Sequence, residues 1–194
     1  MSKSNRMLTK IVYVGIMAAL IFAATHLLSF QIFATPPTMF KTANILCLLA
    51  GMLFGGWYGG LAAGIGSALF DLTSAFAIYS PYTLLTFFCM GAVCGLISHL
   101  GGRKGDNGNL NLYGAILGAC ANWLLYIAQT IALTMIAGSG FQAAALASTT
   151  QMFTATVNAL IAVVGAMLLI TPLRLAFKRA GILARVESMD VRVR

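Results

Sequence analysis

The amino-acid sequence predicts an all-α membrane protein with six transmembrane helices and both termini on the cytoplasmic side. Its composition is the first reason: of 194 residues, 60% are hydrophobic and only 8% are charged, against roughly 25% charged residues in soluble domains. The second reason is a succession of apolar segments, which must be helical because an open sheet edge cannot face lipid. A water-soluble globule is therefore excluded.

The expected spans are residues 9–30, 43–54, 59–76, 82–100, 112–137 and 146–173. The second span is short, so residues 43–76 fit either one long tilted helix or two short helices joined at the glycine-rich residues 55–60 (GGWYGG). Six spans of about 20 residues use about 120 residues. Too few remain for a separate soluble domain, so we expect residues 1–194 to form a single six-helix domain.

The positions of the basic residues favour six spans over five. With six spans and a cytoplasmic start, every Lys and Arg except Lys41 falls on the inside. This agrees with the excess of Lys and Arg in the short cytoplasmic loops of membrane proteins. With five spans, the basic C-terminal tail would lie outside. The formal net charge of +8 therefore indicates orientation in a lipid bilayer, and we expect no nucleic-acid partner.

Polar residues concentrate in the outer half of this predicted bundle. In the fifth span Asn122, Tyr126 and Gln129 share one helical face, and in the sixth Gln151 and Asn158 do so as well. Polar groups within a membrane are costly and mark functional sites. The candidate substrate-binding residues are Lys41, Asp71, Tyr79, Tyr82, Thr86, Asn122, Tyr126, Gln129, Gln151 and Asn158. Their distribution predicts a blind pocket, open to the outside, for a small, ring-containing, largely uncharged ligand.

Several of these residues have a structural alternative. A single Asn or Gln often joins two helices without touching a ligand. Asp71 either contacts substrate or pairs with Lys41, the only basic residue on the outer side. The outer loop of residues 31–44, stiffened by Pro36 and Pro37, is either a connector or a lid over the pocket.

Metal, redox and catalytic sites are not expected. The four cysteines fall in apolar stretches without CxxC spacing or histidine clusters, so we expect neither disulfides nor a metal site, and no cofactor. A rhomboid-like protease would need G-x-S, but Ile65 takes the place of that glycine before Ser67, and His99 lies at the cytoplasmic end of its helix. We expect no catalytic residues and no enzyme.

Small residues recur every four positions along the first span, at Gly15, Ala19 and Ala23. They form one shallow groove that a second helix can approach closely. That second helix belongs either to the same bundle or to a partner protein, and the spacing alone fits both.

At this point the chain resembles a substrate-binding S component of an energy-coupling factor (ECF) vitamin transporter. Residues 19–23 (ALIFA) match the AxxxA by which such proteins contact the shared T component. Residues 48–72 resemble the family's glycine-rich passage from helix 2 to helix 3. Residues 78–95 resemble the start of helix 4 in the branch that takes up pyridoxine, hydroxymethylpyrimidine or riboflavin. That branch often has a lysine and a glycine after the threonine, whereas this chain reads TFFCMG at residues 86–91, so no single vitamin is indicated.

The resemblance implies an S-component-like bundle in a prokaryotic plasma membrane. Its function would be to bind a vitamin from outside and deliver it with a T component and two ATPase subunits. The partner-binding residues would be Gly15, Ala19 and Ala23. The chain itself has no GxxxxGK[ST] for ATP. The alternatives are a stand-alone secondary transporter, which would need ion-coupling acids beyond Asp71, an intramembrane enzyme, and a purely structural subunit.

Overall fold

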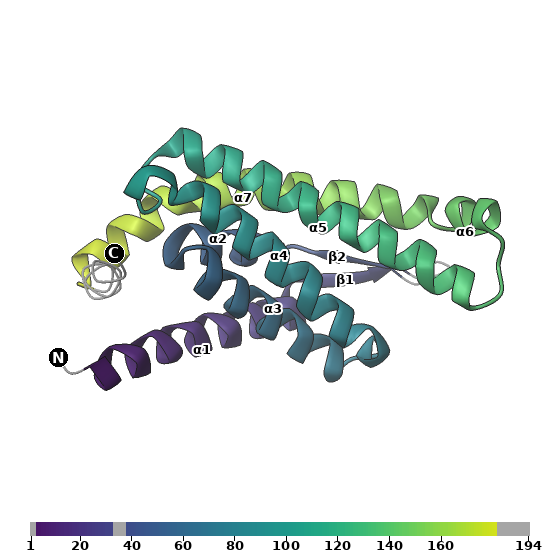
Figure 1. Ribbon diagram of the computed structural model, residues 1–194, viewed down its shortest axis with the longest axis horizontal. Helices are drawn as coiled ribbons and strands as arrows, with labels where there is room; N and C mark the ends of the chain where they lie inside the picture. The colour runs from purple at the N-terminus through teal and green to yellow at the C-terminus, as the bar shows by residue number, and fades with distance from the viewer. Residues whose placement is uncertain (1–2, 33–37, 182–194) are drawn as a thin grey trace.

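The computed structural model describes residues 3–32 and 38–181, which form a helical bundle with one small β-hairpin (Figure 1). The elements are α1 (Lys3–Leu27), β1 (Ser29–Ile32), β2 (Thr38–Lys41), α2 (Asn44–Phe54), α3 (Gly56–Leu72), α4 (Ser80–Ser98), α5 (Gly108–Ile136), α6 (Phe141–Ala147) and α7 (Thr149–Arg179). Short 3-10 turns at Ala77–Tyr79 and Leu100–Gly102 precede α4 and follow it. Figure 1 shows the start of α1 and the end of α7 at the same end of the bundle, with α6 at the opposite end.

The prediction of an all-α membrane protein agrees with this architecture. Four stretches of the described residues are helical, long and apolar enough to cross a bilayer: Leu8–Leu27, Ala77–Ser98, Gly108–Ile136 and Thr149–Arg179. Helix α2, with 11 residues, is too short to cross alone, and α3, with 17, lies at the lower limit. Six spans and their orientation therefore stay predictions.

Residues 43–76 form two helices, not one. The chain turns at Gly55, whose φ of 81° is a left-handed conformation that glycine adopts without steric cost. Around this turn α2, α3 and α4 approach one another closely. A Cβ atom on Gly59 would lie 2.5 Å from the Cα of Gly51, and one on Gly51 would lie 2.5 Å from the carbonyl oxygen of Gly91. The glycine-rich sequence is thus required by backbone-to-backbone packing.

Substituting Gly95 should expose how tight this packing is. A Cβ atom there would lie 2.4 Å from the carbonyl carbon of Gly55 and 2.5 Å from the nitrogen of Gly56, and backbone atoms cannot rotate away. We expect Gly95→Ala to destabilise the protein by about 1–3 kcal/mol, measured by thermal unfolding in detergent. Gly108→Ala is the control, because nothing lies within 4 Å of a Cβ at Gly108. Equal stability of the two variants would contradict this packing.

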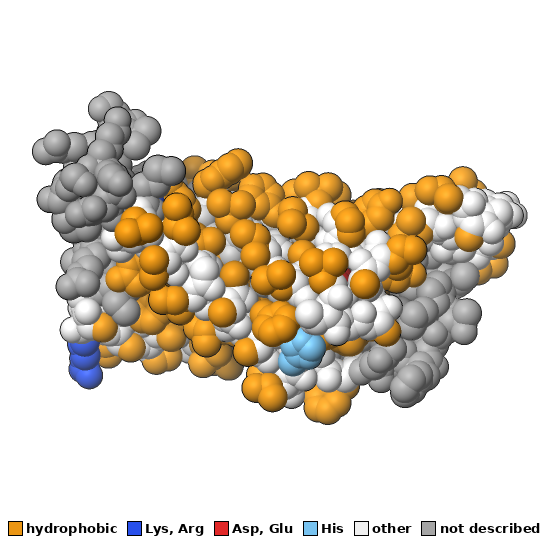
Figure 2. Space-filling view, turned by 90° about the horizontal axis from the view of Figure 1, so that it is seen from below, with side chains coloured by type: hydrophobic (Ala, Val, Ile, Leu, Met, Phe, Trp, Pro, Cys, Tyr) orange, Lys and Arg blue, Asp and Glu red, His pale blue; other side chains and the backbone are white. Residues whose placement is uncertain are grey.

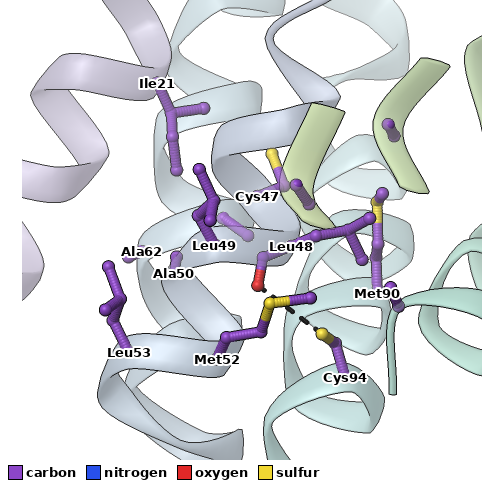
Figure 3. Packing of buried hydrophobic residues seen from close by; sticks show 14 of the residues in the cluster. Ile21, Cys47, Leu48, Leu49, Ala50, Met52, Leu53, Ala62, Met90 and Cys94 are labelled. Carbon is purple, nitrogen blue, oxygen red and sulfur yellow. Dashed lines mark hydrogen bonds between the residues drawn. The ribbon is translucent and has the colours of Figure 1, made fainter. Parts of the chain in front are cut away.

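The hydrophobic core surrounds α2. Seven consecutive residues of this helix, 47–53, are buried. Leu48, Leu49 and Met52 pack there with Met90 and Cys94 of α4, and the Cys94 thiol donates to the carbonyl oxygen of Leu48 at 3.5 Å (Figure 3). On α7 the core continues through Ala162, Ala166 and Ile170. The short helix α2 is therefore the centre of the bundle, enclosed by longer helices.

The outer surface is apolar. Figure 2 shows hydrophobic side chains along the length of one face, with Lys or Arg only at one end of that face. Large exposed hydrophobic residues occur on α1, α4, α5 and α7, among them Ile16, Leu85, Leu124 and Leu168. Contiguous exposed apolar surface of this extent is typical of protein that faces lipid or a partner.

An ion-pair network at the opposite end from α6 was not predicted from the sequence. Arg174 is buried on α7; its Nη1 donates to the carbonyl oxygen of Lys104 at 2.8 Å and its Nη2 lies 2.7 Å from Asp106 Oδ1. Lys178 Nζ also lies 3.1 Å from that oxygen. Helix α7 continues through Pro172 as far as Arg179, which is what brings these side chains to the loop before α5.

Candidate functional site

A cavity of about 330 Å³ lies between α4, α5, α7 and strand β2. Nine of the ten candidate substrate-binding residues line it: Lys41, Asp71, Tyr79, Thr86, Asn122, Tyr126, Gln129, Gln151 and Asn158. They come from segments that are far apart in the sequence, so the fold brings together what the polar pattern singled out. A volume of this size suits a small organic ligand.

Tyr82 is the candidate that does not line the cavity. It is 45% exposed, whereas its neighbours Thr83, Thr86 and Phe87 are buried and line the cavity. Successive helical residues are rotated by about 100°. Tyr82 therefore points away from the face that Thr83 presents.

An ion pair lies in the cavity wall. Lys41 Nζ on β2 is 3.3 Å from Asp71 Oδ1 at the end of α3, with the side chains 17% and 2% exposed respectively. The hydroxyl of Thr83 donates to the other oxygen of Asp71. Lys41 Nζ also lies 5.4 Å and 5.6 Å from the ring centroids of Phe70 and Phe87, within the range of cation–π attraction. The two charges thus compensate each other.

Asn158 on α7 fixes strand β2. Its Oδ1 accepts from the backbone nitrogen of Lys41 at 3.0 Å, and its Nδ2 donates to the carbonyl oxygen of Met39 at 2.9 Å. The side-chain amide thus accepts one hydrogen bond from the backbone of β2 and donates one to it, as the backbone of a neighbouring strand would. β1 pairs with the same strand from Ser29↔Lys41 to Ile32↔Thr38. Of the loop that the sequence suggested as connector or lid, residues 33–37 lie outside the described residues.

Helices α5 and α7 supply most of the amide groups. Gln151 is buried, and its Oε1 has no hydrogen-bond partner within the described residues. The same holds, in the part of the chain that the structure describes, for Oδ1 of Asn122. Buried amide oxygens normally have a donor, so these two are available to a ligand.

Further lining residues were not among the candidates: Met39, Asn44, Phe76, Thr83, Phe87, Thr130, Leu133, Thr134, Ala137 and Ala155. Continuing the α5 pattern outward from Tyr126 in steps of four gives Thr130 and Thr134, so helical periodicity alone could have found those two. No comparable signal existed for Asn44 or Phe76, which reach the cavity from the ends of other segments.

The small residues of α1 face outward. Gly15, Ala19 and Ala23 are exposed, and nothing lies within 4 Å of a Cβ atom built on Gly15. The opposite face, with Met17 and Ile21, is buried. Within the described residues this groove is therefore not filled by another helix of the bundle.

The site offers amide, hydroxyl and aromatic groups together with the Lys41–Asp71 ion pair. Among the described residues, no group of three or more His, Cys, Asp or Glu side chains could hold a metal ion. With Lys41 and Asp71 paired, the remaining polar groups of the lining are uncharged. Such a wall can bind a neutral ligand by hydrogen bonds and ring contacts.

Comparisons with known proteins agree with this description. The sequence model of the family described as ECF-type riboflavin transporter, S component, matches residues 5–175. A search of curated proteins finds no match to the chain. The matched range contains the whole lining of the cavity and the small-residue groove of α1.

Proposed function

Because the chain belongs to the ECF-type riboflavin transporter S component family, we propose that its cavity binds a riboflavin-type vitamin. In this proposal the protein takes the vitamin from outside a prokaryotic plasma membrane and delivers it with a T component and two ATPase subunits. The family consists of transporter components and not of enzymes. The sequence likewise led us to expect no enzyme. The observation that carries the proposal is a polar cavity confined to one half of the bundle.

The distribution of residues along each helix supports a closed pocket. On α4 the cavity is lined by Thr83, Thr86 and Phe87, and the hydrophobic core starts at Phe87 and continues at Met90 and Cys94. On α7 the lining residues lie between 151 and 158, and the core begins at Ala162. Beyond these positions the bundle is packed with the apolar side chains of the core, some of which Figure 3 shows. Within the described residues the cavity lining ends at this packed region, so we expect translocation to need a partner.

The positions of the basic residues support an outward opening. Arg174 contacts the backbone of Lys104 at the end remote from the cavity, and Lys178 lies near the same loop through Asp106. Basic residues accumulate on the cytoplasmic side. The cavity thus lies toward the outside, in the orientation with both termini inside.

The chemistry of the wall supports an uncharged aromatic ligand. Phe76, Tyr79, Phe87 and Tyr126 offer ring faces, which stack on planar rings. The ion pair of Lys41 and Asp71 leaves no net charge. A stand-alone secondary transporter would need an acid free to bind the coupling ion, whereas Asp71 is held by Lys41 and Thr83.

Binding can be tested on the purified protein alone. We expect riboflavin to bind with one-to-one stoichiometry and without ATP, measured by the quenching of flavin fluorescence. Tyr126→Ala and Gln129→Ala should each weaken binding by about tenfold or more, since each removes a contact made in a buried site. Tyr113→Ala is the control, because Tyr113 is on the same helix but 59% exposed and outside the cavity lining.

Two results would contradict parts of this proposal separately. Preferential binding of pyridoxine or hydroxymethylpyrimidine would show that the vitamin is wrong while the pocket stands. Riboflavin affinity that is unchanged in both Tyr126→Ala and Gln129→Ala would show that the ligand binds elsewhere.

A further inference from the structure

Several groups of the cavity wall offer a ligand hydrogen-bond acceptors. Four threonine hydroxyls line it, and each already donates its single proton within the protein. Thr83 donates to Asp71, Thr86 to the carbonyl oxygen of Thr83 at 3.2 Å, Thr130 to that of Tyr126 at 3.0 Å, and Thr134 to that of Thr130 at 2.8 Å. A hydroxyl has one proton and two lone pairs. These four groups therefore offer a ligand lone pairs only.

Two amide oxygens add to these acceptors. Oε1 of Gln151 and Oδ1 of Asn122 are buried and have no partner within the described residues, and the Gln151 side chain is only 4% exposed. By contrast, both polar atoms of the Asn158 amide are used to hold strand β2. An unpaired buried acceptor is unfavourable until a donor reaches it. A ligand that brings N–H or O–H groups removes this penalty at both positions.

The two oxygens belong to side chains at different depths. Helices α5 and α7 run antiparallel (Figure 1), and their register is given by Trp123 Nε1, which donates to Thr156 Oγ1 at 3.1 Å. Asn122 is therefore level with about residue 157 of α7, whereas Gln151 is about six residues nearer to α6. At 1.5 Å per residue this separates the two amides by roughly 9 Å along the cavity.

We propose that Asn122 and Gln151 determine specificity by accepting hydrogen bonds from two opposite ends of one ligand. This inference rests on the proposed function, because riboflavin has such a pair of ends. Its ring system carries one imide N–H, and its ribityl chain carries hydroxyl groups. Thr86, on the neighbouring face of α4, and Thr130 on α5 add acceptors to the same wall. A flavin that lacks either set of donors leaves one buried oxygen unpaired.

The experiment compares three flavins: riboflavin, 3-methylriboflavin, which lacks the ring N–H, and lumiflavin, which has a methyl group in place of the ribityl chain. We expect the wild-type protein to bind each analogue at least about tenfold more weakly than riboflavin. Two variants, Asn122→Leu and Gln151→Met, remove one amide each. One of them should reduce the preference for riboflavin over 3-methylriboflavin by about tenfold, and the other should reduce the preference for riboflavin over lumiflavin by about tenfold.

Matched controls and melting temperatures separate specificity from folding. Asn109→Leu and Gln142→Met remove exposed amides outside the cavity lining and should keep both preferences of the wild type. Wild-type protein that binds all three flavins alike would overturn the inference and leave the proposed function standing. Variants that still distinguish both analogues as the wild type does would overturn it too. If the wild type binds none of the three flavins, the proposed function and this inference both fail.

Discussion

Replacing Lys41 by methionine should lower the free energy of unfolding and the ligand affinity more than replacing Asp71 by asparagine. The reason is the difference in exposure within the pair: Asp71 is 2% exposed and Lys41 is 17% exposed. Without Lys41 the carboxylate of Asp71 stays buried without a counter-charge, and breaking a buried pair in this way costs about 3–5 kcal/mol. Without the carboxylate, the ammonium of Lys41 still reaches water in part.

The double variant decides whether the two residues act as a pair. Lys41→Met with Asp71→Asn removes both charges, so part of the loss in the single variants should return. Unfolding in detergent and riboflavin affinity are measured on all four proteins. Strict additivity would contradict the pairing and would leave Asp71 as a direct ligand contact, the other alternative that the sequence allowed.

A second pair in the same chain provides the control. Lys178 lies 3.1 Å from Asp106, but these side chains are 55% and 53% exposed. Exposed pairs contribute about 0–1 kcal/mol, so Lys178→Met should have little effect on stability and none on ligand affinity. A loss as large as that from Lys41→Met would mean that burial is not what makes the cavity pair important.

Helical periodicity placed candidates on the cavity face of α5 and α7 because both helices are continuous where they line the cavity. On α5 the spacing of Asn122, Tyr126 and Gln129 placed three side chains on one face, and all three line the cavity. Tyr82 is the candidate outside the lining, because it was grouped by its depth, and depth does not fix the direction in which a helical side chain points. One position further along, Thr83 has the correct direction.

The β-hairpin could not be predicted from the sequence. Strands β1 and β2 have four residues each, which is too short for a clear alternating pattern. Strand β2 also depends on a tertiary contact, the amide of Asn158 some 117 positions away in the sequence. The sequence identified Asn158 as a polar residue on the correct face but contained no sign that its amide would bind backbone.

Helix boundaries differed where tertiary contacts decide them. The last expected span, residues 146–173, is divided in the structure between α6 and α7 at Ser148, where neither glycine nor proline marks a break. At its other end α7 continues past Pro172, and Arg174 turns inward to Lys104 and Asp106. A long side chain with its charged group at the end of a bundle can do this, but its partners lie about 70 residues away in the sequence.

The largest functional effect is expected on α1, where Ala19→Trp and Ala23→Trp should abolish uptake while riboflavin binding persists. Both alanines are exposed, so a large side chain there projects away from the rest of the protein. The buried face of the same helix packs on α3, where a Cβ atom on Gly66 would lie 2.6 Å from the carbonyl oxygen of Ala18. An added indole at Ala19 or Ala23 therefore fills the groove without disturbing the core.

The substitution one residue earlier is the matched control. Ala18 is 4% exposed, so Ala18→Trp should overpack the contact between α1 and α3, at about 1–3 kcal/mol or more, and reduce folding and ligand binding together. The measurements are riboflavin affinity, pull-down of a T component and uptake into cells, made on all three variants. We expect Ala19→Trp and Ala23→Trp to lose pull-down and uptake only, because a helix that packs closely against small residues is excluded by an indole ring. Loss of ligand binding in these two variants as well would show that the groove supports the fold, and retained pull-down would show that the T component contacts another surface.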